Sequence, residues 1–293
     1  MMLSWRQALL LGAVLLALGL AARRGPARIR WTGAYLGEAA FLAGAYAGWQ
    51  LLLDALVTRT AGAVAGGRWI WRVERDLRIP SEAWFQRPFV HHPVLGRAAD
   101  AYYGGAHFTV MGLFLVWLFV RHRDRYPELR NQLLLLTAAA AFVQSIPVAP
   151  PRLVPGIGVV DQARLVGASV YGGDGLSDPG QLIAMPSVHV GWAALIAYGV
   201  WHAAPRTGWA RFGRWTGGAH LLVTMAVVVG TGNHYWADGA AALILLVGAV
   251  AAGRAVTRWA PWPAAASWPP AAPPPHHLRL RVRSRTRSTR RDA

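Results

Sequence analysis

The chain has 293 residues, with 30 basic and 13 acidic side chains, a formal net charge of +17, and 54% hydrophobic but only 15% charged residues. A soluble domain carries roughly 25% charged residues, so this composition argues against a soluble enzyme and against intrinsic disorder. Cysteine is absent, which excludes a disulfide framework and a thiolate metal site. All basic residues are arginine, which excludes lysine chemistry such as a Schiff base.

Long apolar runs dominate the chain, and several approach the roughly 20 residues that span a bilayer. They lie at Gln7–Ala22, Ala34–Val57, Ala101–Val120, Asn131–Ala149, Ser187–Ala204, Trp215–Gly232 and Trp236–Ala252. They predict an all-α fold, a polytopic membrane bundle of about six core transmembrane helices plus one N-terminal helix. The arginines that flank the first run mostly follow it, so we interpret it as a retained helix rather than a signal peptide.

The distribution of arginine predicts an orientation, because excess arginine in short loops marks the cytoplasmic side. The arginine-rich segments are Arg23–Arg30, Arg121–Arg130, Pro205–Arg214 and the tail after Ala252. All of them face the same side if each intervening run spans once. The sequence thus predicts a multi-pass protein of the cell membrane with a cytoplasmic C-terminal tail. Residues 58–100 and 150–186 are then extracytoplasmic, and Arg68–Gln86 resembles an amphipathic helix on the lipid surface.

Three units are predicted along the chain. Residues 1–30 form an N-terminal transmembrane helix with a basic loop, and residues 31–254 form the membrane domain. Residues 255–293 are rich in proline, alanine and arginine and are predicted to be disordered, because such a segment cannot bury a core. We expect the arginines of this tail to contact anionic lipid headgroups, and we expect no nucleic-acid partner.

Two short motifs at run ends on the predicted outer side suit the binding of a phosphate group. Arg152 follows prolines that stop the fourth run, and arginine is suited to bidentate phosphate contacts. Ser187 opens the fifth run at or near a helix N-cap, where free N–H groups favour an anion. His189 then lies in the first turn of that helix. Taken alone, each of these residues is also compatible with a purely structural role.

A third motif pairs His234 with Asp238, four residues later. If a helix begins near Trp236, the two side chains share a face. An aspartate that holds one imidazole nitrogen fixes the tautomer and leaves the other nitrogen nucleophilic or basic. A carboxylate near an apolar span is costly without a partner, which makes Asp238 a functional candidate. Together the three motifs contain the groups needed for phosphoryl transfer through a covalent phosphohistidine.

These motifs resemble those of the type 2 phosphatidic acid phosphatase superfamily. The segments are Ala149–Arg152, Pro186–His189 and His234–Asp238. Their sequences are most similar to those of the inositolphosphotransferase branch, which includes fungal inositol phosphorylceramide synthase. The resemblance extends from about Glu74 to Gly253. It also includes upstream positions that look like bacterial members of that branch, namely Glu74, Arg75, Glu82, Gln86, Tyr102, Tyr103 and His107.

The resemblance implies a membrane lipid phosphotransferase or phosphatase that uses no metal and no cofactor, with a phospholipid or other lipid phosphate as substrate. It implies that His234 attacks phosphorus, that Asp238 orients His234, and that His189 protonates the leaving oxygen and then activates the acceptor. Arg152 and Ser187 hold the phosphate oxygens.

The chain departs from the superfamily pattern at Ser145 and Val228, where the pattern has a lysine and an arginine. The site therefore lacks two cationic phosphate contacts, each worth roughly 1.5–3 kcal/mol. Arg164 and His107 are candidates for additional contacts.

Two other functions use the same residues. His189, His234 and Asp238 are three possible zinc ligands with an open fourth position, which would make the protein a metal-assisted membrane hydrolase. Polar groups at span ends also suit a non-enzymatic lipid transporter or scaffold. The spans are otherwise poor in charge, which argues against a transporter; the main exceptions are Glu38 and Asp54, in the second run.

Overall fold

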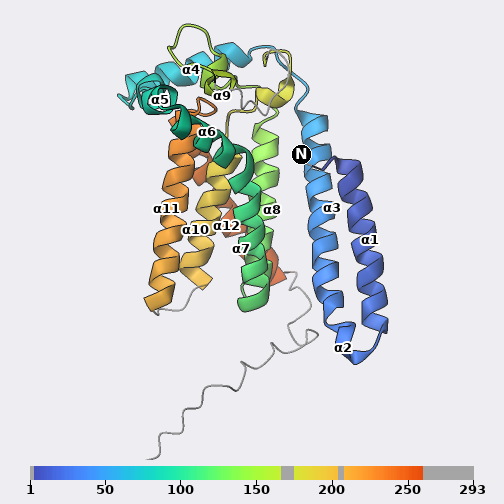
Figure 1. Cartoon of the computed structure of the whole chain (residues 1–293). Coiled ribbons are helices and arrows are strands. Elements are labelled where there is room, and N and C mark those ends of the chain that lie inside the picture. The colour runs from blue at the N-terminus through green and yellow to red at the C-terminus, as the bar shows by residue number, and fades with distance from the viewer. Residues whose placement is uncertain (1–2, 166–174, 204–207, 260–293) are drawn as a thin grey trace, which may run out of the picture.

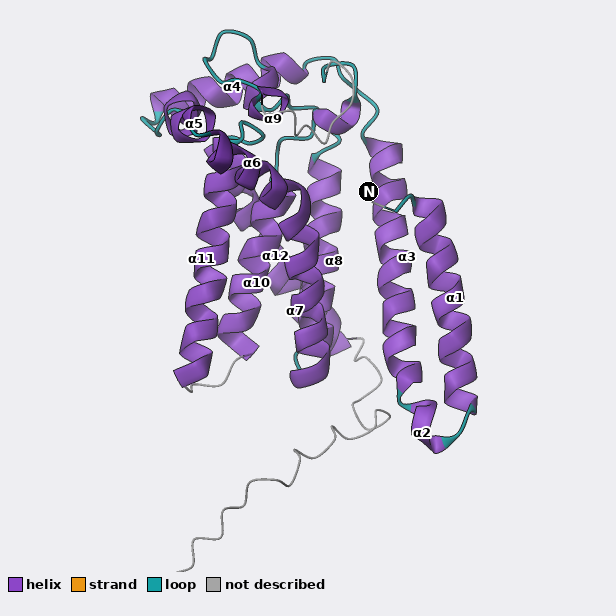
Figure 2. Ribbon diagram, in the orientation of Figure 1, coloured by secondary structure: helices purple, strands orange, loops and turns teal. Residues whose placement is uncertain are grey.

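The computed structural model describes residues 3–165, 175–203 and 208–259, and across these residues the chain forms helices and loops with no strand (Figure 2). The long helices are α1 (Trp5–Arg24), α3 (Thr32–Leu56), α7 (His107–Arg121), α8 (Tyr126–Val143), α10 (Val188–Ala203), α11 (Gly208–Gly230) and α12 (Trp236–Trp259). The shorter ones are α2 (Ala27–Arg30), α4 (Ala63–Asp76), α5 (Glu82–His91), α6 (Pro93–Ala101) and α9 (Gln162–Leu165). The predicted all-α class is confirmed.

The helices form a bundle with a cap at one end. Figure 1 shows α7, α8, α10, α11 and α12 side by side, with α4, α5 and α9 lying across one end and α6 descending from them into α7. Helices α1 and α3 form an antiparallel pair beside α8, joined by α2 at the end opposite the cap. The candidate catalytic motifs lie where the bundle meets the cap.

Packing of the bundle follows the arrangement expected in lipid. Tyr126, Leu118 and Leu195 are fully buried between α7, α8 and α10. In contrast, Leu222 of α11 and Ile244 of α12 are each 72% exposed. Water would penalise such large outward apolar surfaces, whereas hydrocarbon does not. The exposed apolar faces therefore identify the bundle as a membrane domain.

Four helical stretches within the described residues are long and apolar enough to cross a membrane: Trp5–Arg24, Ala27–Leu56, Pro93–Arg121 and Trp236–Arg258. Helices α8, α10 and α11 do not meet the same criterion, although they lie alongside the others in the bundle. Helix α10, with 16 residues, is also shorter than a typical span. The protein thus has several helices fit to span a membrane, as predicted.

Two predicted boundaries were wrong. The fourth run was expected to be helical to Ala149, but α8 ends at Val143 and residues 144–149 are irregular, since Pro147 cannot continue a helix. The amphipathic segment Arg68–Gln86 is two helices, α4 and α5, because the backbone at Arg78 turns into the left-handed region at φ 57°. The break lets α4 and α5 cover the end of the bundle from two directions.

The arginine-rich connections lie at the end away from the cap. Helix α1 and helix α7 both run toward that end, and their final turns carry Arg23, Arg24 and Arg121. These connections lie at the end opposite the motifs, as the loop pattern predicted, but residues 58–100 at the cap end also carry seven arginines, together with four acidic residues. The tail from residue 260 onward, expected to be disordered and to contact anionic lipid, lies outside the described residues, as do residues 204–207 of the basic segment between α10 and α11.

A buried ion pair joins the α1–α3 pair to the bundle. Glu38 of α3 accepts hydrogen bonds from Arg130 Nη1 at 2.9 Å and from Tyr126 Oη at 2.8 Å, and Glu38 and Arg130 are 6% and 3% exposed. This contact gives the charge within the second run a structural partner. It also weakens the transporter hypothesis, which used Glu38 as a pathway residue.

We expect Arg130→Leu to destabilise the protein by about 3–5 kcal/mol, because it leaves the Glu38 carboxylate buried without its partner. The double variant Glu38→Leu/Arg130→Leu is expected to recover most of that loss, since neither charge is then buried. Thermal unfolding in detergent measures both. Equal destabilisation in the single and double variants would contradict this account of the contact.

Candidate active site

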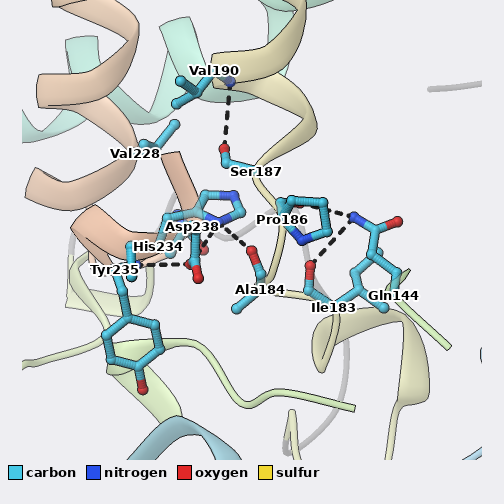
Figure 3. A network of polar contacts seen from close by, with 12 residues as sticks. Gln144, Ile183, Ala184, Pro186, Ser187, Val190, Val228, His234, Tyr235 and Asp238 are labelled. Atoms are coloured by element: carbon cyan, nitrogen blue, oxygen red, sulfur yellow. Dashed lines mark hydrogen bonds and ion pairs between the residues drawn. The ribbon is translucent and has the colours of Figure 1, made fainter. Parts of the chain in front are cut away.

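His234 lies in the short connection between α11 and α12, with its imidazole held on one side (Figure 3). Its Nδ1 is 2.8 Å from the carbonyl oxygen of Ala184 and 3.1 Å from Oδ2 of Asp238. Helix α12 begins at Trp236, as required for His234 and Asp238 to share a face. His234 is 5% exposed and Asp238 is fully buried, so water does not compete for these bonds.

The hydrogen bonds assign the tautomer of His234. A backbone carbonyl only accepts, so Nδ1 carries the proton and donates it toward Ala184 and Asp238. Nε2 then carries the lone pair. Burial lowers the pKa of His234 to about 4; the carbonyl of Ala184 raises that pKa and the charge of Arg152 lowers it. The ring is therefore a neutral imidazole whose basic nitrogen is Nε2.

The Ala184 carbonyl is itself fixed by backbone contacts. Ala184 N–H donates to Val148 at 3.1 Å, and Val148 N–H donates to Leu182 at 2.7 Å, which forms an isolated bridge between the two loops. Gln144, just after α8, donates through Nε2 to the carbonyl of Pro186 at 3.2 Å. The loop that follows α8 thus sets the position of the carbonyl that selects the His234 tautomer.

Ser187 and His189 begin α10 as predicted. Ser187 is buried, and its Oγ accepts from Val190 N–H at 3.4 Å, the contact of an N-cap residue (Figure 3). Its own N–H donates to the Asp238 carbonyl at 3.1 Å, which ties α10 to α12. His189 is half-buried one residue into the helix, with its ring centroid 5.9 Å from that of His234.

A π-helical turn places a second group against His189. Residues Tyr102–Ala106 form this turn between α6 and α7, and such turns recur at functional sites. It brings the Tyr103 carbonyl 3.3 Å from His189 Nε2 and stacks the Tyr103 ring on the His189 ring at 4.2 Å. His107, the first residue of α7, follows this turn directly, and its ring centroid lies 4.3 Å from those of His189 and Trp192. His107 is thus in the site, next to His189.

Arg152 lies beside His234 but is held by three side chains. Its Nε donates to Asn233 at 2.9 Å, its Nη1 to Asp161 at 3.1 Å and its Nη2 to Gln181 at 3.1 Å. Asp161 also pairs with Arg164, at 3.4 Å. The Asp161 carboxylate therefore forms ion pairs with both candidate phosphate-binding arginines, although the Arg164 side chain is 46% exposed and that of Arg152 only 3%.

Neither of the two positions at which the chain departs from the superfamily pattern places a polar side chain in the described part of the site. Ser145 Oγ donates to the Phe142 carbonyl of its own helix end at 2.7 Å. Val228 is buried in a small apolar cluster with Val190, and its carbonyl accepts from the N–H groups of Asn233 and His234. The candidate site is consequently built around Arg152 and Arg164.

Sequence reasoning missed Asp161, and it named Gln86, the residue that positions Asp161, only as part of the family resemblance and without a role. Gln86 of α5 is buried and forms a two-way amide contact with Val160, donating at 2.9 Å and accepting at 3.0 Å. This contact fixes the backbone immediately before Asp161. Asp161 lies in an irregular loop, where no periodicity marks it; its only sequence signal is an acidic residue between two arginines.

Glu74 joins the cap to α12, the helix that carries Asp238. Its Oε1 accepts from Ala237 N–H at 2.7 Å, so a residue of α4 caps the first turn of α12. Burial raises the pKa of Glu74 well above its usual range, and a hydrogen bond with neighbouring Glu82 raises it further. Arg75 lies 3.4 Å from Glu82 and 3.7 Å from Glu74, which leaves the pair with one compensating charge. A proton held on Glu74 relieves the remaining repulsion.

Gly232 is at φ 73°, and a Cβ there would lie 2.9 Å from Val159 Cγ1. We expect Gly232→Ala to lower stability by about 1–2 kcal/mol from the left-handed backbone alone, and to lower activity by moving Arg152, whose N–H donates to the Gly232 carbonyl. Gly248→Ala is the matched control, since beyond its own helical turn no atom lies within 4 Å of its Cβ position. Thermal unfolding and turnover measure both variants; equal stability in the two would contradict this role for Gly232.

Two further observations describe the surroundings of the site. Within the described residues, no group of three histidine, cysteine, aspartate or glutamate side chains is arranged to hold a metal ion. A cavity of about 10 Å³ lies beside His189, between Tyr102, His107 and His220. This volume holds about one water molecule.

Comparisons with known proteins identify the family. A family model described as the PAP2 superfamily, the type 2 phosphatidic acid phosphatases, matches residues 68–252. This range runs from within α4 to within α12 and contains all of the site residues described above. Comparison with curated proteins and with solved structures found no match. The match covers more than half of the chain, and the protein therefore belongs to the PAP2 superfamily.

Proposed function

We propose that the protein is an integral membrane phosphotransferase or phosphatase that acts on a lipid phosphate or phosphodiester through a phosphohistidine at His234. Membership of the PAP2 superfamily suggests a lipid phosphatase or phosphotransferase, and the apolar helices fit a membrane protein. One observation carries the finer proposal. Nδ1 of His234 is bound by Ala184 and Asp238, so the nitrogen left with a lone pair is Nε2.

In the first step, Nε2 of His234 attacks phosphorus, and the bond from phosphorus to the leaving oxygen breaks. His189 gives its proton to that oxygen, which leaves as an alcohol. Asp238 stabilises the positive charge that forms on the His234 ring. The His189 and His234 ring centroids are 5.9 Å apart, a separation that lets both imidazoles reach one phosphoryl group.

In the second step, His189 takes a proton from water or from an acceptor hydroxyl, whose oxygen attacks phosphorus and breaks its bond to Nε2. Water gives a phosphatase and an alcohol gives a phosphotransferase. Arg152, Ser187 and neighbouring N–H groups hold the phosphate oxygens, with Arg164 and His107 as additional contacts. The reaction uses no metal and no other cofactor.

Two finer assignments belong to the proposal. The motifs Ala149–Arg152, Pro186–His189 and His234–Asp238 support the inositolphosphotransferase branch, in which the acceptor is an inositol or a similar polyol. The concentration of arginine at the end opposite the site supports an extracytoplasmic active site in the cell membrane.

Purified protein supplied with radiolabelled phosphatidic acid, phosphatidylinositol or a prenyl diphosphate tests this function, with and without an inositol acceptor. Free phosphate indicates hydrolysis, and a new phosphodiester formed only with the acceptor indicates transfer. Movement of unmodified lipid between vesicles, with no product from any substrate, would favour the transporter hypothesis instead.

The pKa of His234 predicts an unusual acid limit for the reaction. Only neutral imidazole attacks phosphorus, and burial lowers the pKa of His234 from the ordinary 6.5 to about 4. As pH falls, phosphoenzyme formation is therefore expected to persist through pH 6.5 and to decline only near 4. Single-turnover labelling across this range measures the limit, with circular dichroism at each pH as the folding control. A decline centred at 6.5 would contradict the buried, neutral ring.

A further inference from the structure

A second cavity lies at the end of the bundle away from the candidate active site. It has a volume of about 240 Å³ and lies between the start of α8 and the ends of α10 and α12. Three arginines line it, Arg125, Arg254 and Arg258, together with Glu128, Tyr198 and His202. It is far larger than the cavity of about 10 Å³ beside His189.

The contacts of these arginines leave the cavity positively charged. Arg254 donates through Nη2 to Tyr198 Oη at 2.8 Å and lies 3.4 Å from Glu128. Arg125 pairs with Asp124 at 3.4 Å, in a contact where the side chains are 56% and 76% exposed, so that solvent screens it strongly. Arg258 has no ion pair within the described residues. Three guanidinium groups thus face one lining carboxylate.

Helix dipoles do not account for this arrangement. A cation at a helix C-terminus is favourable, which explains Arg254 and Arg258 near the end of α12. Arg125, however, is the N-cap residue of α8, where the positive end of the dipole disfavours a cation. An anion in the cavity would be stabilised by Arg125, by the start of α8 and by the two arginines of α12 together.

The volume of the cavity and its level in the membrane indicate which kind of anion it binds. Pockets for whole drug-sized ligands are about 300–1,000 Å³, so this cavity admits a headgroup rather than an entire lipid. It lies among the ends of apolar helices, at the level where phospholipid headgroups meet a membrane domain, and basic pockets between transmembrane helices bind such headgroups. Exposed Val256, 43% exposed on α12 between the two arginines, offers an apolar contact for an acyl chain.

We propose that this cavity binds the phosphate headgroup of an anionic phospholipid. The guanidinium groups of Arg254 and Arg258 donate to the phosphate oxygens, and Arg125 completes the site from α8. The proposal is independent of catalysis, because the cavity is lined by the last turns of α12, whereas His234 lies just before the first turn of that helix, at the opposite end of the bundle (Figure 1).

The test uses full-length protein carrying His234→Ala, so that turnover does not consume the lipid. Short-chain phosphatidylglycerol is titrated in detergent and binding is followed by native mass spectrometry, with phosphatidylcholine and inorganic phosphate as parallel ligands. Arg254→Gln/Arg258→Gln removes two cavity charges. Arg28→Gln/Arg30→Gln is the matched control, since these exposed residues of α2 lie at the same end of the molecule but outside the cavity.

Phosphatidylglycerol is expected to bind more tightly than phosphatidylcholine. The cavity double variant is expected to bind phosphatidylglycerol at least about tenfold more weakly than the parent does, because it loses one or more charge-assisted hydrogen bonds. The control variant should bind like the parent. Arg258→Gln alone, which breaks no ion pair within the described residues, should show a smaller loss and carries the test if the double variant misfolds. Unchanged binding in the cavity variants, an equal loss in the control, or full competition by inorganic phosphate at lipid concentrations would each overturn the proposal.

Discussion

Replacing His234 by alanine is expected to abolish phosphoenzyme formation and to reduce turnover by roughly 10⁵-fold or more, the scale that follows removal of a covalent nucleophile. The imidazole is buried, neutral and bound at Nδ1 by Ala184 and Asp238. Among the described residues, His189 and His107 are the other imidazoles of the site; His189 Nε2 is 3.3 Å from the Tyr103 carbonyl, and neither ring contacts a carboxylate. The site thus has no second histidine held in the same way to replace His234.

Labelling with radioactive substrate, followed by a denaturing quench, detects the intermediate directly, and phosphohistidine is distinguished by its acid lability. His92→Ala is the matched control, because His92 is an exposed residue at the end of α5. It should label and turn over like the wild type. An acid-labile phosphoenzyme in His234→Ala would remove His234 as the nucleophile while leaving membership of the PAP2 superfamily intact.

The long helices were predictable because membrane spans are long, apolar and poor in charge. Each of the seven predicted runs corresponds to a long helix. Their ends were less predictable. Apolar residues continue past Val143 toward Ala149, yet Pro147 and the backbone bridge at Val148 hold this segment as a loop that supports His234. Hydropathy alone does not distinguish a helix end from an apolar loop buried in a cap.

The residues of the three motifs were predictable because each motif is short and local. His234 and Asp238 are one helical turn apart, and Ser187 opens its own helix. Asp161, Gln86 and Glu74 act across separate elements: Gln86 of α5 fixes the loop of Asp161, and Glu74 of α4 caps α12. Such contacts depend on how the cap folds onto the bundle, which no local pattern encodes.

The same distinction separates the rival functions. A zinc site and a phosphohistidine site use the same three residue types, so composition and spacing leave both open. The geometry favours the phosphohistidine, because Nδ1 of His234 is engaged by a carbonyl and a carboxylate in the arrangement that orients a catalytic imidazole. The geometry also weakens the transporter hypothesis, because the ion pair with Arg130 gives Glu38 a structural role.

Asp238→Asn is expected to lower kcat by about 10³–10⁴-fold while leaving KM nearly unchanged. Oδ2 of Asp238 accepts from Tyr235 N–H at 2.8 Å and lies 3.1 Å from His234 Nδ1. The amide is close in size to the carboxylate but carries no charge. It therefore cannot stabilise the imidazolium that forms when Nε2 bonds to phosphorus, and its NH₂ group can also impose the wrong tautomer. Steady-state kinetics together with the rate of phosphoenzyme formation separates this effect from substrate binding.

Asp161→Asn is the informative companion, because it makes the same chemical change at the carboxylate that gathers Arg152 and Arg164. Those arginines are proposed to bind the phosphate oxygens, so loss of their shared anchor should raise KM severalfold and change kcat much less. In the proposed mechanism, Asp238 acts on the transition state through His234, whereas Asp161 acts on substrate binding through two cations. If Asp238→Asn raised KM and left kcat unchanged, Asp238 would be a structural cap of α12, and the role of His234 as an oriented nucleophile would lose its principal support.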